Sequence, residues 1–378
     1  MPRSKIPDST HAELVARSAG RCEFCNVFLY RHPLTGERGN FAEDAHIVAF
    51  SERGPRGEED RPADINNIDN LMLLCRPDHK LIDDNEERYT RPFLELRKRE
   101  HEARIQRVTE YGPSTQTTVL QLKVKIGSQV VEVDRTETFE ALFPRYAVAD
   151  PHIIDLTGLG DEEPGAFYKL AADLIRRRAA LLYEAGSDLE RTRHLSVLAL
   201  APIPLLVNLG NSLSNKVATD FYQCHRTRPE NRWNWYEGAP PARFALRRLR
   251  TGTDPAAVGL VLSLSGAIDI GSLPAHVDER FSVYEISPVD AVPSTGLLRQ
   301  KEDLEAFRAV YRNALAELRR GHPGLKVLHV FPALPAPAAV TCGFDLLPKV
   351  DPELRIYDNV KTEGGFVERL SVNAHEQQ

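Results

Sequence analysis

The order of apolar and polar positions in the first hundred residues predicts short elements around a small core. Residues 8–19 have apolar side chains at helical spacing and end at Ala19-Gly20, a typical helix stop. Residues 51–66 are rich in charge, glycine and proline, which is typical of a loop. Residues 91–109 predict a charged helix that leaves this part of the chain.

The pattern changes near residue 110. Residues 120–134 alternate apolar and polar side chains around Gly127-Ser128, which predicts a β-hairpin. We therefore assign residues 110–160 to a connector that carries this hairpin and docks one domain on the next. Residues 164–186 follow as an amphipathic helix.

From about residue 195 the alternation of strands and helices predicts an α/β domain with a largely parallel sheet covered on both faces. Residues 195–207 predict a buried strand with a proline-marked bend, and a helix is expected to open within 208–216. We find no sequence repeat, although the layout permits two similar halves that open near residues 195 and 258. Further strands are expected at 258–264, 281–286, 325–331 and 339–345, with a long helix at 300–320.

Cysteine spacing in the first part predicts a structural zinc site. Cys22 and Cys25 stand in a CxxC pair, and Cys75 follows about fifty residues later with Asp78 three positions beyond it. Three thiolates and one carboxylate can complete a tetrahedral zinc site, although cysteine or histidine is more usual than aspartate as the fourth ligand. His79 is the alternative fourth ligand. A metal here would act as the core of a loop too polar to fold without it.

Three polar residues near these cysteines follow one another in an order that suggests catalysis. His46 closes one expected strand, Asn70 precedes the strand Leu71–Leu74, and His79 lies on an expected helix. Cleavage of a phosphodiester needs a base and a divalent cation, and the pKa of histidine suits the first task near neutral pH. The order resembles the HNH nuclease motif, a ββα-metal fold. The resemblance implies that His46 is the general base and that Asn70 and His79 orient it or hold the metal.

One position departs from the common form of this motif. Many relatives carry a metal ligand directly before the base, where this chain has Ala45. Asp44 is the candidate replacement beside His79, but alternation along a strand would point it to the opposite face. We expect magnesium or manganese as the catalytic ion because phosphate chemistry favours hard, oxygen-binding cations. His11, His32 and His101 lack such partners in the sequence and are expected at the surface.

A second resemblance covers much of the remaining chain. Residues 201–216, 221–226, 233–235 and 329–345 resemble the SAVED domain, a fused pair of CARF-like Rossmann units that senses cyclic oligonucleotides. An HNH nuclease fused to SAVED is the architecture of effectors in bacterial CBASS anti-phage defence. The fold class is then α/β, or α+β for the whole chain. The expected domains are the zinc-stapled HNH nuclease at 1–109, the connector at 110–160, and SAVED at 161–378.

A cyclic dinucleotide or trinucleotide carries phosphates and bases, so its site needs backbone amides at a helix start, cations, and aromatic platforms. The first expected helix of the sensor and the flanks of the long helix offer such groups. Core packing remains the alternative for the tryptophans, and an ordinary turn or surface charge for the others. The candidates are Gly210, Asn211, Ser212, Trp233, Trp235, Tyr236, Arg299 and Lys301.

Composition limits how the chain engages its partners. The net charge of −6 leaves no broad basic surface, so DNA contact rests on the metal and on a local patch. No apolar run approaches a membrane span and no signal segment follows Met1, so a cytoplasmic bacterial protein without membrane partners is expected. The patch expected to contact DNA comprises Arg53, Arg56, Arg61, Arg76 and Lys80.

These observations predict a metal-dependent endonuclease that cuts double-stranded DNA with little sequence preference after a cyclic oligonucleotide binds. Activation is expected through assembly, from a dimer to a tetramer or larger oligomer. Two alternatives stay open at this point. One is an HNH restriction nuclease that senses modified DNA, with Trp233 and Trp235 as a cage. The other is a catalytically degenerate, ligand-gated binding module, which the replacement at Ala45 would mark.

Overall fold

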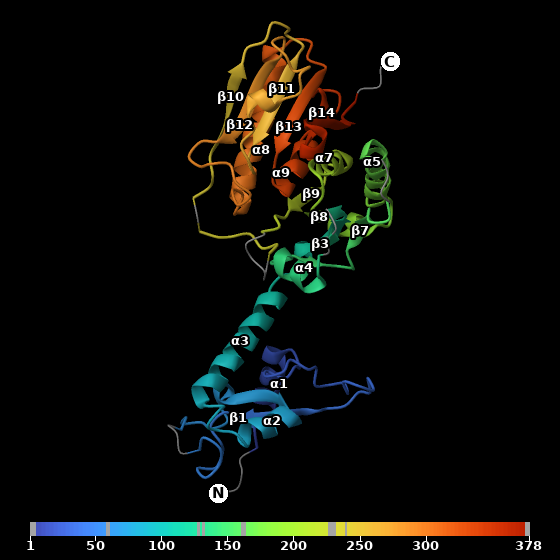
Figure 1. Cartoon of the computed structure of the whole chain (residues 1–378). Coiled ribbons are helices and arrows are strands. Elements are labelled where there is room, and N and C mark those ends of the chain that lie inside the picture. Colours follow the sequence, from blue (N-terminus) through green and yellow to red (C-terminus); the bar gives the residue numbers. More distant parts are fainter. Residues whose placement is uncertain are drawn as a thin grey trace. The chain divides into compact units, whose positions relative to one another are not determined.

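The computed structural model describes residues 5–57, 61–126, 129–130, 133–159, 164–225, 232–238 and 240–374. The chain divides into two compact units, Met1–Pro113 and Ser114–Gln378, which are described separately (Figure 1). None of the helices in the described ranges is both long and apolar enough to cross a bilayer.

The N-terminal unit has the predicted ββα arrangement. Strands β1 (Ala42–His46) and β2 (Leu71–Cys75) pair antiparallel, with His46 opposite Leu71, and η1 (Ile68–Asn70) leads into β2. Helix α2 (Arg76–Asp83) follows β2 without a break, and α3 (Arg91–Thr109) completes the unit. Helix α1 (Asp8–Ser18) stops where predicted, because Ala19 and Gly20 have left-handed φ angles of 53° and 66°.

A compact apolar cluster holds these elements together. Each of its central side chains is almost fully buried, and every one of the four apolar residues of β2 belongs to it. The core of this unit is therefore a real apolar core as well as a metal cluster. Its members include Leu14, Leu29, Ala45, Ile47, Leu71, Met72, Leu73, Leu74, Ile82 and Leu94.

The second unit contains two large sheets, each belonging to one half of an α/β domain. The first has the strand order β6-β3-β8-β9, with β7 also pairing with β3, and all of these pairs are parallel. Its strands are β3 (Gln116–Lys123), β6 (Tyr146–Ala147), β7 (His152–Asp155), β8 (His194–Ala199) and β9 (Ala218–Phe221). The helices of this half are α4 (Arg135–Leu142), α5 (Pro164–Leu181), α6 (Asp188–Thr192) and α7 (Ile203–Ser212), and η2 (Pro113–Thr115) precedes β3.

The second sheet has the order β10-β12-β11-β13-β14-β15, parallel in the centre and antiparallel at both edges. Its strands are β10 (Phe244–Arg250), β11 (Val258–Ser263), β12 (Ser282–Pro288), β13 (Val327–Ala333), β14 (Glu353–Val360) and β15 (Gly365–Val372). Side chains of α8 (Lys301–Gly321) and α9 (Ala336–Phe344) share one apolar core with one face of this sheet. A smaller apolar cluster covers the other face, where η3 (Ile270–Ser272) lies, and η4 (Lys361–Glu363) joins β14 to β15.

The stretch predicted as a connector differs in the structure. Residues 116–123 form β3, which pairs with β8 along five residues and so lies inside the first sheet. The reason is burial, because Val119, Leu120 and Leu122 are all almost fully enclosed. The predicted hairpin exists as the short antiparallel pair β4 (Lys125–Ile126) and β5 (Gln129–Val130), while Gly127-Ser128 lie outside the described residues.

Two predicted elements of the sensor are wrong, for one physical reason. Helix α7 begins at Ile203 and ends at Ser212, although the sequence predicted a strand up to 207. Residues 336–344 form helix α9, although a strand was expected at 339–345. In both helices a proline occupies the N-cap and another lies in the first turn, a position where the missing N–H costs nothing. Short apolar runs do not distinguish a buried helix from a buried strand, so only these prolines marked the difference.

The two helices also reveal a short internal repeat. Pro202-x-Pro204, Gly210 and Leu213 recur at the same spacing as Pro335-x-Pro337, Gly343 and Leu346. A Cβ atom on Gly210 would lie 1.8 Å from the carbonyl oxygen of Val340, and one on Gly343 would lie 1.9 Å from that of Val207. The two glycines therefore allow α7 and α9 to pack backbone against backbone where the two halves of the sensor meet.

Candidate functional site

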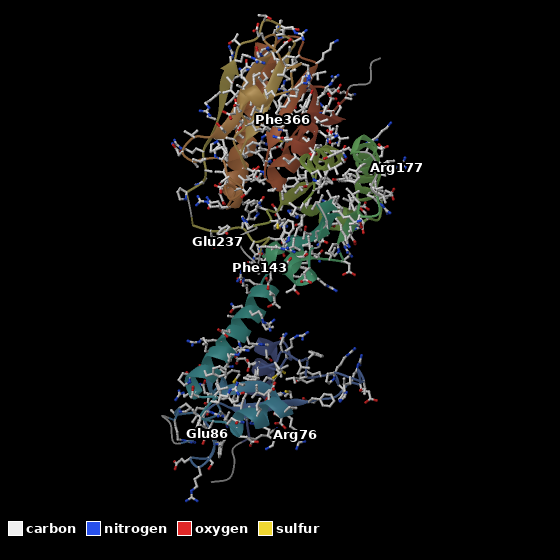
Figure 2. The ribbon with its side chains drawn as sticks, viewed as in Figure 1. Arg76, Glu86, Phe143, Arg177, Glu237 and Phe366 are labelled. Carbon is white, nitrogen blue, oxygen red and sulfur yellow. The ribbon has the colours of Figure 1, made fainter. Side chains whose placement is uncertain are left out.

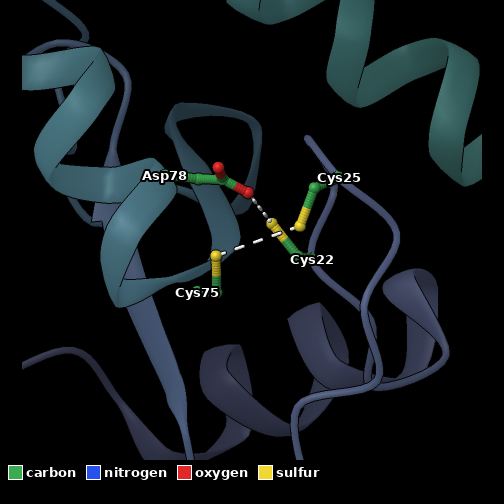
Figure 3. Close-up of side chains that lie close together, drawn as sticks. All are labelled: Cys22, Cys25, Cys75 and Asp78. Atoms are coloured by element: carbon green, nitrogen blue, oxygen red, sulfur yellow. Dashed lines mark hydrogen bonds between the residues drawn. The ribbon is translucent and has the colours of Figure 1, made fainter. Parts of the chain in front are cut away.

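The predicted zinc ligands lie together in the N-terminal unit (Figure 3). One ligand atom from each of Cys22, Cys25, Cys75 and Asp78 lies within 4.8 Å of all the others. The Sγ of Cys22 is 3.1 Å from Oδ2 of Asp78, and the Sγ atoms of Cys25 and Cys75 are 3.9 Å apart. The loop after α1 supplies the first two ligands, while the end of β2 and the first turn of α2 supply the others.

The chemistry of this cluster fits a zinc ion. Burial raises the pKa of the Cys22 thiol and raises that of Cys75 to about 12, so bare thiolates would be unfavourable there. Burial also opposes ionisation of Asp78, but hydrogen bonds from the three thiols lower its pKa overall. A dication offsets the cost of the thiolates and releases their protons when it binds. The cluster can therefore hold a zinc, and His79 does not belong to it.

A cavity of about 930 Å³ lies on the other side of α2. Strand β1 contributes Asp44 and His46 to its wall, and α2 contributes His79 and Asp83. The loop that follows β1 forms the rest, including Phe50 and the turn from Ser51 to Pro55. The structure thus places Asp44, His46 and His79 on one cavity, and it adds Asp83.

His46 is placed as a base. It is the last residue of β1, half-buried, and its Nε2 lies 3.0 Å from Oδ1 of Asn66. When Nε2 donates to this oxygen, Nδ1 keeps the lone pair that a general base needs. The ring of Phe50 packs edge-on at 6.2 Å and restricts the imidazole further.

Asn70 acts through the backbone. Its side chain is buried, with Oδ1 accepting from the Val48 amide at 2.9 Å. Its Nδ2 donates to the carbonyl oxygens of Val48 at 3.1 Å and Ile65 at 2.9 Å. Because both ends of the amide are engaged, Asn70 is a positioning residue that ties the chain after His46 to the end of the following loop. Asn70 does not line the cavity itself.

The prediction that Asp44 would point away from the site is wrong. Ala45 is the residue that points into the core, with 3% of its surface exposed, whereas Asp44 lines the same cavity as His46. Alternation along β1 explains this, since residues two apart share a face. His11 of α1, expected at the surface, places Nδ1 at 2.8 Å from Asp44 Oδ2. His101 was also expected at the surface but is buried, with Nε2 at 3.1 Å from the Ser18 carbonyl.

His79 lies between two carboxylates. Its Nδ1 is 2.7 Å from Oε2 of Glu43 and its Nε2 is 3.3 Å from Oδ2 of Asp83. Hydrogen bonds to Asp83 and Glu43 outweigh burial and raise the pKa of His79. Burial alone would raise the pKa of Asp83, but the bonds from His79 and Arg56 lower it. The four-residue spacing of His79 and Asp83 on one helix face was the signal that could have revealed Asp83 from the sequence.

The donors on this cavity fit a divalent metal. Asp44 and Asp83 offer carboxylate oxygens and His79 offers an imidazole nitrogen, a set that suits magnesium or manganese. Glu43 at the other nitrogen of His79 is the type of outer partner that orients metal-binding histidines. Among the described residues, the thiol cluster is the only group in which three or more ligand atoms of His, Cys, Asp or Glu lie within 4.8 Å of one another. The three donors on the cavity do not all lie within this distance of one another.

Two of the arginines predicted to contact DNA have structural roles instead. Arg56 is 6% exposed and donates through Nε to the Ile47 carbonyl at 2.6 Å and through Nη2 to Asp83 at 2.8 Å. Arg61 donates to the Ala49 and Phe50 carbonyls at 3.0 and 2.8 Å. Both guanidinium groups hold the cavity wall in shape, because a buried cation needs partners.

The other three predicted DNA contacts are exposed. The Arg76 side chain is 88% exposed and lies on the outer surface of the N-terminal unit (Figure 2). Lys80, also exposed, pairs with Asp84 at 2.7 Å. Arg53 lies on the loop that lines the cavity.

The sensor candidates separate into two groups, and the members of the first are engaged in helix packing, an apolar cluster or an ion pair. Gly210, Asn211 and Ser212 end helix α7, where the sequence predicted a helix start, and Gly210 packs against α9. Trp233 is fully buried in an apolar cluster with Leu142, Leu198 and Tyr222. Lys301 is 2.5 Å from Asp220 and so is held in an ion pair.

The second group lies near a cavity. Trp235 and Tyr236 are half-buried and flank His225, with ring centroids 5.9 and 4.7 Å from the imidazole. The Tyr236 amide donates to the Arg299 carbonyl at 2.9 Å. Arg299 lines a cavity of about 560 Å³ with Arg243, at the carboxyl end of strand β12.

Two family models match separate parts of the chain. One, described as HNH endonuclease, matches residues 22–86. The other, SAVED, described as SMODS-associated and fused to various effectors sensor domain, matches residues 175–372. No curated protein matches the sequence.

Solved structures give a more distant similarity. One is the Acinetobacter baumannii Cap4 SAVED/CARF-domain containing receptor with the cyclic trinucleotide 3'3'3'-cAAA, at 14% identity and a TM-score of 0.42, covering 81% of this chain. The Moraxella osloensis Cap4 receptor matches at 12% identity and a TM-score of 0.35, over 78% of this chain and 60% of that one. This chain spans 64% of the length of the A. baumannii receptor.

Proposed function

The chain belongs to the SAVED family of sensor domains, and because an HNH endonuclease domain precedes the sensor, we propose that it is an effector nuclease that cuts double-stranded DNA when a cyclic oligonucleotide binds. The observation that carries the nuclease half is the cavity on which Asp44, His46, His79 and Asp83 converge. The sensor half is supported by the SAVED match over residues 175–372.

The residues on the cavity divide the work of phosphodiester hydrolysis. Nδ1 of His46 removes a proton from the attacking water, while Asn66 and Phe50 hold the ring in one orientation. Asp44, His79 and Asp83 would hold a divalent cation, which supplies Lewis acidity toward the phosphate and the leaving oxygen when bound. Asn70 and Arg56 act indirectly. Asn70 fixes the loop after His46, and Arg56 fixes the carboxylate of Asp83.

The zinc cluster stabilises the helix that forms one wall of this cavity. It joins the loop after α1 to the start of α2, the helix that carries His79 and Asp83. Loss of the zinc would free the first turn of α2 and misplace both side chains. We therefore assign the zinc a structural role, and magnesium or manganese the catalytic one.

The cavity beside β12 is the proposed site for the cyclic oligonucleotide. It lies outside the carboxyl end of a parallel strand, the position where open α/β sheets bind ligands. Arg299 supplies positive charge for phosphates, beside Arg243, which Asp290 holds at 2.6 Å. Trp235 and Tyr236 supply aromatic faces near the cavity. Lys301 and Gly210 to Ser212 have no part in this revised site.

Assembly is the proposed means of activation, from a dimer to a tetramer or larger oligomer, in anti-phage defence. Several cations of the N-terminal unit are already neutralised by carboxylates, so one copy offers DNA few free charges. Two copies together would double that number and place two cavities on one duplex. Sedimentation with and without the activating nucleotide tests this, and an unchanged mass would contradict it.

Neither alternative receives support from the site. Trp233 is fully buried, so it cannot form a cage for a modified base with Trp235. The replacement at Ala45 does not remove a ligand from the cavity, because Asp44 occupies its wall.

Cleavage of supercoiled plasmid by the full chain with magnesium, assayed against individual cyclic di- and trinucleotides, tests the proposal. We expect cleavage with one nucleotide and none without it, and His46→Ala should abolish it. Cleavage without any nucleotide would contradict the switch. Intact plasmid with every nucleotide, in a protein that retains zinc, would contradict the nuclease.

A further inference from the structure

A narrow two-stranded finger, residues 28–41, joins the cysteine loop to the catalytic strand. Its arms are linked by backbone hydrogen bonds, from Phe41 to Leu29 at 2.9 Å and from His32 to Glu37 at 2.8 Å. In Figure 1 this dark-blue segment between α1 and β1 extends away from the two-stranded sheet. The second arm runs directly into β1, so a contact made by the finger bears on the strand that carries Asp44 and His46.

The turn at the end of the finger has a fixed shape. Nδ1 of His32 accepts hydrogen bonds from the amides of Leu34 and Thr35, at 3.4 and 3.2 Å. Gly36 adopts a left-handed φ of 71°, which favours glycine. The ring of His32 packs edge-on against Phe41, 5.7 Å away. His32 was expected to be a surface residue without partners, but it organises this turn.

Two arginines face each other across the finger. Arg31 and Arg38 form an isolated antiparallel bridge, so their side chains leave the same face as direct neighbours. Both are exposed, and within the described part of the chain neither has an ion-pair partner. Like charges in this position are destabilising. An anion between them would relieve the repulsion.

The finger also ends in an exposed apolar side chain. Leu34 is 90% exposed, the most exposed of the large apolar residues described. The fixed shape of the turn leaves the Leu34 side chain without an apolar surface to pack against. Many proteins that bind the DNA minor groove insert an apolar side chain between base steps, and arginines nearby can contact the backbone phosphates.

We propose that the finger grips duplex DNA at the minor groove, with Arg31 and Arg38 on backbone phosphates and Leu34 in the groove. This inference rests on the proposed function, since it gives the nuclease its grip on the substrate. Because the finger continues into β1, the contact would fix the position of His46 along the backbone. Charge decides between DNA and a second copy of the finger, because two such arginine pairs would repel each other.

Equilibrium binding tests the inference without cleavage. The full chain carrying His46→Ala is titrated against a fluorescent duplex of about 30 base pairs in magnesium, with and without the cyclic nucleotides of the plasmid assay. Salt is varied from 50 to 200 mM. Arg31→Ala/Arg38→Ala is compared with Arg91→Ala/Arg99→Ala, which removes the same charge from helix α3. Zinc content and self-association are measured for each variant.

We expect the finger variant to bind on the order of tenfold more weakly, with the slope of log affinity against log salt smaller by about 2. Leu34→Ser should weaken binding and leave that slope unchanged. The α3 variant should bind like the parent.

Equal affinity and slope in the finger and α3 variants would overturn the inference. So would a finger variant that changes only self-association, which would assign the finger to a contact between copies. Absence of DNA binding by the parent would instead contradict the DNA substrate itself, and the finger inference with it.

Discussion

At the scale of single residues, the nuclease cavity depends on carboxylates whose role the motif alone did not reveal. Asp83 contacts His79 on one side and the buried Arg56 on the other, so its position is determined from two directions. A carboxylate fixed in this way and facing a cavity is suited to hold a cation that the reaction requires.

Asp83→Asn should therefore lower the cleavage rate by roughly 100-fold or more, because the amide keeps the shape but loses the charge that the metal needs. The rate is measured on plasmid under the conditions in which the parent cleaves. Asp84→Asn is the matched control, since Asp84 is the next residue and, among the residues that the structure describes, its ion-pair partner is exposed Lys80. Equal rates in the two variants would exclude Asp83 from the site.

His329 in the sensor makes stability depend on pH. Burial, helped by Arg355 and His276, lowers the pKa of His329 from 6.5 to about 4, and its Nδ1 contacts the Tyr357 hydroxyl at 2.9 Å. In the unfolded chain His329 binds a proton near pH 6.5, whereas in the folded chain it binds one only near pH 4. The stability of the second unit should therefore be full above pH 7 and fall as pH drops between these values.

Thermal unfolding between pH 7.5 and 5 measures this effect. His329→Gln should flatten the dependence on pH. His152→Gln, which replaces a more exposed histidine, should leave it as in the parent. A parent whose melting temperature rises as pH falls in this range would contradict the assignment.

At the scale of elements, the crossing of α7 and α9 is the feature that the two halves of the sensor share. Both helices start at prolines and approach at a glycine, and no side chain fits between them. Close backbone contact of this kind tolerates no added atom.

Gly210→Ala should destabilise the second unit by about 2 kcal/mol or more, since the new Cβ would force the helices apart. Gly165→Ala is the matched control: Gly165 also lies in a helix but has nothing within 4 Å of its Cβ position. That change should be neutral or stabilise by a few tenths of a kcal/mol. Denaturant unfolding compares the two, and equal stabilities would contradict the close crossing.

Local spacing explains which elements the sequence predicted. The ββα unit follows from short-range patterns. The zinc ligands Cys22, Cys25, Cys75 and Asp78 follow from two short motifs with typical zinc-ligand spacing, and the structure brings the two motifs together. The predictions for the start of α7 and for α9 were wrong because a buried apolar run has the same pattern in a helix as in a strand. Strand β3 failed because its partner β8 lies more than seventy residues away. The contact of His11 with Asp44 spans 33 residues and joins two elements, so no local pattern predicted it.

At the scale of the whole molecule, the proposed activity needs a base and its metal ligands in one unit and a charged cavity in the other. Activation requires that binding in the sensor reaches the nuclease. Assembly of several copies would provide that link without a continuous path through one chain.

The most direct measurement is the rate of plasmid cleavage as a function of the concentration of the activating cyclic nucleotide, for the parent and for Arg299→Ala. Arg312→Ala, an exposed arginine on α8, is the control. We predict that Arg299→Ala raises the half-maximal concentration about tenfold or more and keeps the maximal rate, because a phosphate contact is lost while the nuclease is intact. A parent that cleaves equally without nucleotide, or an Arg299→Ala curve that matches the parent, would contradict the account.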